Sequence, residues 1–395
     1  MATPSAQMAK TTESYMSSPD RVTQVYIGKS ADAMGGPGTF IGNLYRACEA
    51  GKGFLITEEP QAADVYLVVA ESVSIRCLWQ FWRQGRPIIH RLDGKKTPIR
   101  TSVQQARVGR GAVGKLLYGV RLWRSQTRKM LRVWLSLLLA DAVIYQSDFV
   151  RRQWRSWERL RRIFRNRFST VIINGLPSAK VPPRAFDSGH SSGVKRVIAA
   201  KGYYRTSDIL EALVQQLTDA SFQENAKAQF PNTAIQIDVF GHLEGFETVY
   251  SRLDAFESKA IHPHVWIVFH GLKPRAEVEK ALLNSETVGS LLLEDYPACP
   301  NSAFESQALG LPVIGSQGGA NPEILLFKEL LVDPFQKSTA LFGKQLLFAL
   351  EFCLSIKPQK RTRLAEMTAT AFGDNKFEEY LRFIQFVVQK RLGRG

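Results

Sequence analysis

The sequence repeats one feature along most of its length: short, nearly continuous runs of apolar residues rich in Val and Ile. Runs without polar alternation are typical of strands buried on both faces, as in parallel sheets covered by helices. Helical patterns lie between several of the runs, for example at residues 207–217 and 275–283. This alternation predicts an α/β fold with parallel sheets and right-handed crossovers. The runs expected to form strands are residues 25–28, 65–70, 87–90, 142–146, 170–173, 196–199, 235–241, 265–270, 290–293, 312–315 and 330–332.

A stretch rich in proline, glycine and serine, residues 177–194, separates these runs into two groups. Such a stretch without an apolar run is typical of an interdomain linker, and 395 residues suffice for two domains. We therefore expect two doubly wound domains, with the ligand at the carboxyl ends of their strands, in the cleft between them. The expected parts are a disordered tail (1–24), an N-terminal domain (25–176), the linker (177–194), a C-terminal domain (195–370) and an amphipathic C-terminal helix (371–395).

Cysteine spacing and hydropathy exclude several classes of protein. The four cysteines lie far apart with no CxxC pair, which excludes a disulfide framework and a structural zinc site. They are expected to be small core residues in a reducing compartment. No run approaches ~18 apolar residues, and the first residues lack the apolar region of a signal peptide. These observations predict a cytoplasmic protein without a transmembrane helix.

Positive charge is concentrated in one segment. The chain carries 52 Lys and Arg against 36 Asp and Glu, and residues 100–168 hold seventeen basic and three acidic residues. A field of this sign attracts an anionic membrane surface, a nucleic acid or a phosphorylated ligand. Residues 151–168 are predicted to form a basic amphipathic helix that carries Trp154 and Trp157. Such helices commonly lie on anionic membranes, although the apolar stripe also fits a core-facing side with a solvated arginine face.

The most informative stretch is residues 299–323. Ser302 is expected to cap a helix over residues 303–309, which ends at Gly310 and leads into a buried strand. That strand opens into a Gly318–Gly319 turn before a second helix. Backbone N–H groups at helix starts and in glycine turns bind anions. Glu305, in the first helical turn, can accept hydrogen bonds from a diol such as a ribose.

This stretch resembles the C-terminal signature of family 4 retaining glycosyltransferases, which have the GT-B fold and use nucleotide-activated sugars. Residues 34–44, 140–150, 171–177 and 269–272 resemble further motifs of the family in the same order, so the resemblance covers about residues 25–332. It implies an α/β GT-B fold, with two doubly wound Rossmann-like domains facing a central cleft. The signature positions that match are Ala308, Gly310, Pro312, Val313, Ile314, Gly318 or Gly319, and Glu323.

The resemblance also implies roles in binding the donor nucleotide. Glu305 would contact the ribose, and Lys201 and Arg205 would bind the diphosphate, although their order and spacing differ from the usual pattern. The positive charge of both residues suits a leaving diphosphate. The remaining residues assigned to the nucleotide site are Gly35, Gly36 and Gly38 of the glycine loop, Asn301 and Ser302 at the helix start, and Glu323.

The residues that would contact the donor sugar are less regular. The family has a second Glu eight positions before the ribose-binding one, but Pro297 stands there, so either Glu294 or Asp295 is expected to replace it. His90 and Asp93 follow a buried strand of the N-terminal domain and are candidates for the same task, while His90 also fits a core histidine. No cofactor is expected, and no metal, because no DxD-type motif is present.

The resemblance implies a retaining, metal-independent glycosyltransferase that transfers a sugar from a nucleotide-sugar donor to an acceptor hydroxyl. A lipid-linked or glycan acceptor in cell-surface polysaccharide or glycolipid synthesis is expected, with residues 100–168 docking the protein on the inner face of the membrane. Two alternatives stay open. Pro297 leaves room for a catalytically weak GT-B scaffold subunit. A basic nucleic-acid-binding protein would leave the Glu305 signature unexplained, and no nucleic-acid partner is expected.

Overall fold

The structure of the chain is a computed structural model. It describes residues 22–28, 36–50, 53–94, 112–157, 168–176, 193–204, 208–243, 263–294, 296–333 and 339–393. Most of the expected tail and linker, and the candidate site residues Gly35, Arg205 and Asp295, lie outside these ranges.

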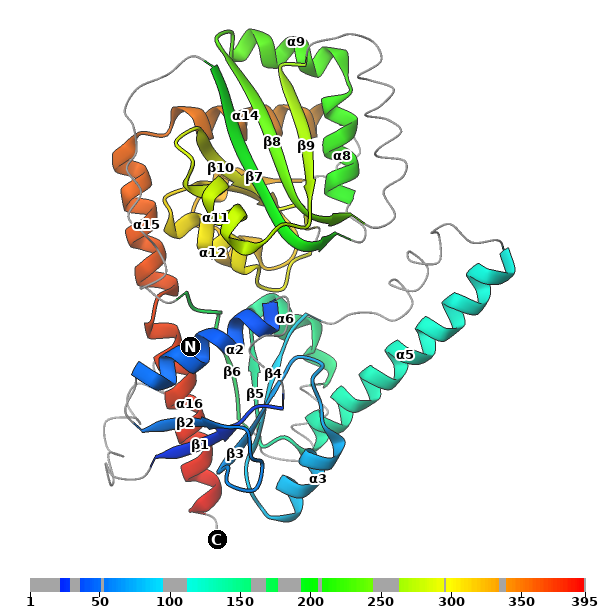
Figure 1. The fold of residues 1–395 in the computed structure, drawn as a ribbon, viewed down its shortest axis with the longest axis vertical. Helices are drawn as coiled ribbons and strands as arrows, with labels where there is room; N and C mark the ends of the chain where they lie inside the picture. The colour runs from blue at the N-terminus through cyan, green and yellow to red at the C-terminus, as the bar shows by residue number, and fades with distance from the viewer. Residues whose placement is uncertain are drawn as a thin grey trace.

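Twelve parallel strands form two six-stranded sheets in the described part of the chain, stacked along the long axis of the molecule (Figure 1). The N-terminal sheet has the order β2-β1-β3-β4-β5-β6. Three of its strands, β3, β4 and β5, are buried along their whole length, as expected from the apolar runs in the sequence. Its strands are β1 (Thr23–Tyr26), β2 (Phe54–Thr57), β3 (Val65–Val69), β4 (Ile88–Leu92), β5 (Ala142–Tyr145) and β6 (Phe168–Val171).

The C-terminal sheet has the order β12-β11-β10-β7-β8-β9. The chain runs outward from β7 to β9, returns to β10 beside β7, and then continues in the opposite direction. This reversal places a topological switch point between β7 and β10, where doubly wound folds bind their ligands. The strands are β7 (Gly193–Tyr204), β8 (Thr233–Leu243), β9 (Val265–Gly271), β10 (Thr287–Leu291), β11 (Val313–Ser316) and β12 (Leu331–Val332).

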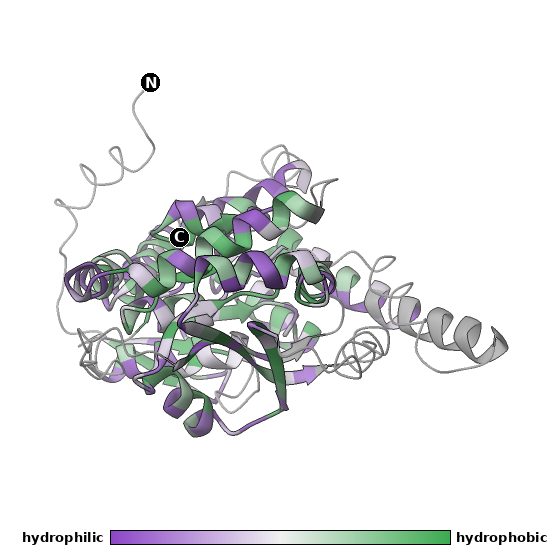
Figure 2. Cartoon of the chain, turned by 90° about the horizontal axis from the view of Figure 1, so that it is seen from above, coloured by the Kyte–Doolittle hydropathy of each residue, from purple (hydrophilic) through white to green (hydrophobic). Residues whose placement is uncertain are grey.

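Helices cover both faces of each sheet, as buried parallel strands require. One face of the N-terminal sheet packs against α2 (Gly36–Ala50) and α16 (Asn375–Leu392), and the other against α3 (Ile75–Arg83), α5 (Ala112–Leu139) and α6 (Asp148–Gln153). One face of the C-terminal sheet packs against α8 (Asp208–Leu217), α9 (Ala220–Gln229) and α14 (Thr339–Ser355), and the other against α11 (Arg275–Leu283). In Figure 2 the strands are mostly green, whereas the surrounding helices carry purple segments.

The chain ends on the domain where it began. Helix α15 (Pro358–Phe372) descends from the C-terminal domain, and α16 then lies along the N-terminal sheet (Figure 1). Residues of α16, including Phe377, Tyr380 and Ile384, are buried in the core of that sheet. The Tyr380 hydroxyl donates to the Ile172 carbonyl oxygen at 2.8 Å. The amphipathic pattern at the end of the sequence is therefore explained by burial against the first domain.

The α/β fold with two doubly wound sheets is confirmed, and each of the eleven expected strands overlaps an observed one. Strand β2 was not expected. The continuous helix expected over residues 151–168 is wrong at two points, because α6 ends at Gln153 and Phe168 begins β6. Residues 155–157 are again helical, and residues 158–167 lie outside the described residues. The expected cap at Ser302 is also wrong, because α12 (Asn301–Ala308) begins before it, after Pro300, and has no side-chain cap. Of the four cysteines, which are free thiols, Cys48, Cys299 and Cys353 are buried and Cys77 is partly so.

Candidate functional site

Polar side chains gather where strands of the two sheets end. In the N-terminal domain, Asp93 follows β4, Gln146 and Ser147 follow β5, and Asn174 follows β6. In the C-terminal domain, Glu294 follows β10, and the residues after β11 form the Gly318–Gly319 turn. Carboxyl ends of parallel strands are where doubly wound sheets bind ligands. Ser147 and Asn174 contact residues that follow β10, so the two edges are joined to each other.

Two expected site residues meet at the switch point of the C-terminal sheet. Lys201 lies in β7 and Glu294 follows β10, the strand that pairs with β7. The Lys201 Nζ and Glu294 Oε1 atoms are 2.6 Å apart, and both side chains are partly exposed. The structure thus places a cation and a carboxylate within reach of a ligand at this point. A cation here can stabilise a diphosphate, and a carboxylate can accept hydrogen bonds from sugar hydroxyls.

Glu305 lies in the middle of α12. Hydrogen bonds between buried side chains of this helix and neighbouring segments hold the helix in place. The buried hydroxyls of Ser290 in β10 and Ser306 in α12 are hydrogen bonded at 2.7 Å. Gln307 is buried on the same helix; its amide donates to the Ile324 carbonyl at 3.2 Å and accepts from the Leu326 N–H at 2.8 Å. Because these bonds satisfy buried polar groups, they hold α12 against β10 and the chain after β11. Glu305 itself is only partly buried, with Arg275 Nη2 2.8 Å from its Oε1.

The loop that departs from the family pattern packs tightly onto the glycine turn. Gly319 has φ +68°, a left-handed conformation that favours glycine. A Cβ at this position would lie 2.5 Å from the Pro297 carbonyl oxygen, which accepts a hydrogen bond from the Ala320 N–H at 2.8 Å. The Ser316 hydroxyl donates to the Glu294 carbonyl at 3.2 Å. These contacts hold the loop after β10, which includes both Glu294 and Pro297, against the residues that follow β11.

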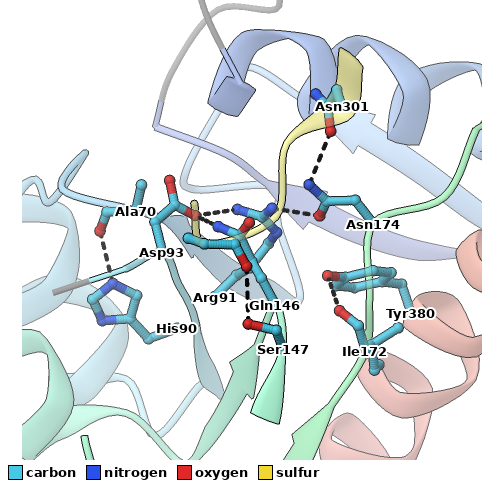
Figure 3. Close-up of polar contacts among 11 residues, drawn as sticks. Ala70, His90, Arg91, Asp93, Gln146, Ser147, Ile172, Asn174, Asn301 and Tyr380 are labelled. Atoms are coloured by element: carbon cyan, nitrogen blue, oxygen red, sulfur yellow. Dashed lines mark hydrogen bonds and ion pairs between the residues drawn. The ribbon is translucent and has the colours of Figure 1, made fainter. Parts of the chain in front are cut away.

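The N-terminal edge is organised around a buried arginine that the sequence analysis missed (Figure 3). The side chain of Arg91 is 1% exposed; its Nη1 atom lies 2.6 Å from Asp93 Oδ1, and its Nη2 atom donates to Asn174 Oδ1 at 2.6 Å. Its guanidinium carbon lies 3.9 Å from the centre of the Phe40 ring. Burial alone would lower the pKa of Arg91, but Asp93 and Tyr380 raise it above its usual value. Asp93 also accepts from the Gln146 amide, so its carboxylate is held from two sides.

His90 points away from this network, as Figure 3 shows. It is fully buried in β4, and one ring nitrogen, Nε2, lies 2.8 Å from the Ala70 carbonyl oxygen. Burial lowers its pKa to about 4, so the ring is neutral at pH 7. A buried His90 would contact a ligand only if the surrounding chain opened, and its role at the donor sugar stays a prediction.

Polar contacts join the two domains at these edges. The Ser147 hydroxyl donates to the Ala298 carbonyl at 2.9 Å, and the Asn174 amide donates to Asn301 Oδ1 at 3.1 Å. Glu323, in α13 (Asn321–Ile324), accepts hydrogen bonds from backbone N–H groups at the start of α6. Because Asn174 also contacts Arg91, the Arg91 network reaches the first residue of α12. The carboxyl edges of the two sheets therefore face and touch each other.

The remaining expected residues lie around this junction. Gly36 begins α2, and Gly38 is buried in its first turn, so the glycine stretch becomes the start of a helix. Asn301 and Ser302 are partly buried in the first turn of α12. Among the described residues, no three His, Cys, Asp or Glu side chains converge as metal ligands.

Two parallel Rossmann-like sheets that face each other, with the last helix returning to the first domain, define the GT-B fold, and this chain has it. Solved structures share the fold. Sucrose-phosphate synthase from Thermosynechococcus elongatus superposes with a TM-score of 0.60 at 14% identity, over 93% of this chain and 99% of that chain. HepE from Anabaena, in complex with UDP, gives 0.54 at 10%, over 92% and 99%. An E. coli protein bound with UDP-2-fluoro glucose gives 0.56 at 11%, over 89% and 78%. No family model and no curated protein sequence matches the chain.

Proposed function

We propose that this chain is a retaining glycosyltransferase that transfers a sugar from a nucleoside-diphosphate sugar to an acceptor hydroxyl. The observation that carries the proposal is the Lys201–Glu294 pair at the switch point between β7 and β10. It supplies a cation for a diphosphate and a carboxylate for a sugar, in the crevice where this fold binds ligands. The UDP of HepE and the UDP-2-fluoro glucose of the E. coli neighbour support a nucleotide-sugar donor of this kind.

Each of these residues has a separate task in the proposed reaction. Glu305 accepts hydrogen bonds from the ribose hydroxyls, and Lys201 stabilises the charge that develops on the departing diphosphate. In the structure Glu294 pairs with Lys201. When the diphosphate replaces Glu294 as the partner of Lys201, the Glu294 carboxylate accepts hydrogen bonds from the sugar hydroxyls. Asp93, held by Arg91 and Gln146, faces the same junction from the other domain.

The chemical step needs no nucleophile from the protein. The bond between the anomeric carbon and the diphosphate oxygen breaks, and the acceptor oxygen bonds to the anomeric carbon on the same face. Because the new bond forms on the face that the diphosphate leaves, the configuration is retained, and the acceptor proton passes to the departing phosphate oxygen. We infer that the reaction is metal-independent, with Lys201, together with Arg205, supplying the positive charge. Contact between the domains would limit loss of the donor to water.

The acceptor is proposed to be lipid-linked or a glycan, approached from the inner face of a membrane in cell-surface polysaccharide or glycolipid synthesis. The support comes from α5, which extends beyond the N-terminal sheet (Figure 1). Val133 and Leu137 on this helix are buried in the core. Next to this buried side the helix carries an exposed apolar stripe, Leu131, Trp134 and Leu138, followed around the helix by an exposed basic stripe, Arg124, Arg128 and Arg132.

Adjacent apolar and basic stripes match the interface of an anionic bilayer, where apolar side chains enter the acyl region and arginines bind headgroup phosphates. The neighbouring helix α3 adds Trp79, about half exposed and stacked on Trp82 with ring centres 4.8 Å apart. Among the described residues, no helix is both long and apolar enough to cross a membrane. We propose that the association is peripheral, through the exposed stripes of α5 and Trp79 of α3.

Thermal unfolding with a panel of UDP-, GDP-, ADP- and dTDP-sugars tests the donor site. A ligand at about 100 times its Kd stabilises the folded state by about 2.7 kcal/mol, which raises the Tm by several degrees. We expect a shift with one nucleotide class that is lost in Glu305→Ala. Glu277→Ala is the matched control, because Glu277 is an exposed acid that pairs with Lys273. No shift with any donor would contradict the proposal and favour a scaffold or nucleic-acid-binding role.

A further inference from the structure

Arg275 occupies a position that its own helix does not favour. It is the first residue of α11, directly after the N-cap residue Pro274. A cation at a helix N-terminus opposes the helix dipole. Its pairing with Glu279, four residues later, has the less favourable order for a helical ion pair, in which the acid stands on the C-terminal side. Helix stability therefore does not account for Arg275, and its contact outside the helix becomes informative.

That contact joins α11 to α12. Arg275 Nη2 lies 2.8 Å from Glu305 Oε1, and Arg275 Nε lies 2.6 Å from Glu279 Oε1. The two bonds use different nitrogens of one planar guanidinium, so Glu279 fixes the plane that is presented to Glu305. Burial opposes the charge of Arg275, but the two carboxylates hold its pKa above the usual value. The side chain is about half exposed, so a ligand in contact with Glu305 can approach it.

We propose that Arg275 is a positioning residue for the donor nucleotide: held by Glu279, it fixes the ionised Glu305 carboxylate in the orientation that accepts hydrogen bonds from the ribose hydroxyls. This inference rests on the proposed function, which places the ribose at Glu305. A fixed carboxylate discriminates between hydroxyls, whereas a freely rotating one does not. The preference for a ribonucleotide over its 2′-deoxy counterpart should therefore depend on Arg275 as well as on Glu305.

Calorimetric Kd values for UDP, GDP or ADP, whichever binds most tightly, and for the matching 2′-deoxynucleotide test the proposal. For the unmodified protein we expect the ribonucleotide to bind at least about 10-fold more tightly than the 2′-deoxynucleotide, as a hydrogen bond to a charged group implies. Arg275→Ala should reduce this ratio to about 1–3, as should Glu305→Ala. Arg275→Lys, which keeps the charge but loses the planar fork, should give an intermediate ratio.

Lys273→Ala is the matched control, because Lys273 adjoins the same helix start and pairs with Glu277 rather than Glu305. A purely electrostatic role for Arg275 would weaken both nucleotides equally and leave the ratio unchanged, which would overturn the proposal. If Glu305→Ala abolished the preference for the ribonucleotide but Arg275→Ala kept it, the proposal for Arg275 would be overturned, whereas the proposed function would stand. Failure of the unmodified protein to bind any nucleotide would instead contradict the proposed function. Circular dichroism and an unchanged Tm would show that each variant is folded.

Discussion

Glu323 of the C-terminal domain accepts a hydrogen bond from the backbone N–H of Phe149 in the N-terminal domain, with 2.6 Å between Oε1 and N. Its other oxygen accepts from the Asp148 N–H at 2.7 Å, and Arg152 Nη2 lies 3.2 Å from Oε1. A carboxylate from one domain thus satisfies the first N–H groups of a helix in the other. The sequence resemblance assigned Glu323 to the nucleotide site, and that role stays a prediction.

Removing this carboxylate should loosen the contact between the domains. Loss of a helix-capping side chain costs about 1 kcal/mol, so Glu323→Ala should lower stability by that amount. It should also increase the radius of gyration measured by small-angle X-ray scattering, because fewer polar contacts hold the domains together. Glu329→Ala, an exposed acid in the same region, is the control. An unchanged radius of gyration in Glu323→Ala would show that the other interdomain contacts suffice.

Burial of His90 predicts a pH-dependent stability. Its pKa is about 4 in the folded protein and about 6.5 when unfolded. Between these values the unfolded state binds a proton that the folded state does not, so stability is full above pH 6.5 and falls as the pH is lowered towards 4. The full difference is about 3 kcal/mol. Urea unfolding at pH 7 and pH 5 should show a smaller loss in His90→Gln than in the unmodified protein; an equal loss would contradict this burial effect.

Gly319 and Gly271 form a matched pair for testing the loop after β10. Both have φ +68°, but a Cβ at Gly319 would strike the backbone of Pro297, whereas nothing lies within 4 Å of one at Gly271. Gly271→Ala should therefore cost only the backbone strain, about 1 kcal/mol. Gly319→Ala should cost about 2–3 kcal/mol and weaken donor binding, since it displaces the loop that carries Glu294. Equal effects on unfolding free energy would show that the close contact is easily relieved.

Neutralising the basic stripe of α5 tests the membrane proposal. Replacement of Arg124, Arg128 and Arg132 with Ala should reduce sedimentation with anionic vesicles of phosphatidylglycerol about 10-fold or more, since each cation near such a surface contributes about 1 kcal/mol. The control replaces three exposed lysines of the C-terminal domain, Lys227, Lys344 and Lys360. Equal binding of both triple variants would contradict docking through α5. Loss of RNA binding, rather than vesicle binding, would favour the nucleic-acid alternative.

The sequence was sufficient for the strands that are buried on both faces, because their apolar runs are a local signal. Strand β2 was missed although it contains the short apolar run Phe54–Ile56; it lies partly exposed at the edge of its sheet. The helix expected over 151–168 failed because continuous amphipathic spacing does not reveal the turn at Trp154.

Polar contacts between distant segments could not be predicted either. Arg275 and Glu305 are separated by 30 positions, and Glu323 and Phe149 by 174. Neither spacing leaves a local pattern. Arg91 was missed although its partner Asp93 is only two positions away; its contact with Asn174, 83 positions away, leaves no local pattern. By contrast, Lys201 and Glu294 were each predicted from a different motif of the family. They meet because β7 and β10 are neighbours in the sheet.

The most direct test of the account is proton NMR of the purified protein incubated with UDP-, GDP-, ADP- and dTDP-α-glucose, with water as the acceptor. We expect slow release of nucleoside diphosphate from one donor, with α-glucose as the first sugar formed. Lys201→Ala should slow release about 10²–10³-fold, the usual cost of removing a group that stabilises transition-state charge. Lys195→Ala, in the same strand but paired with Glu286, should not. First formation of β-glucose, or donor binding without any release, would contradict a retaining transferase.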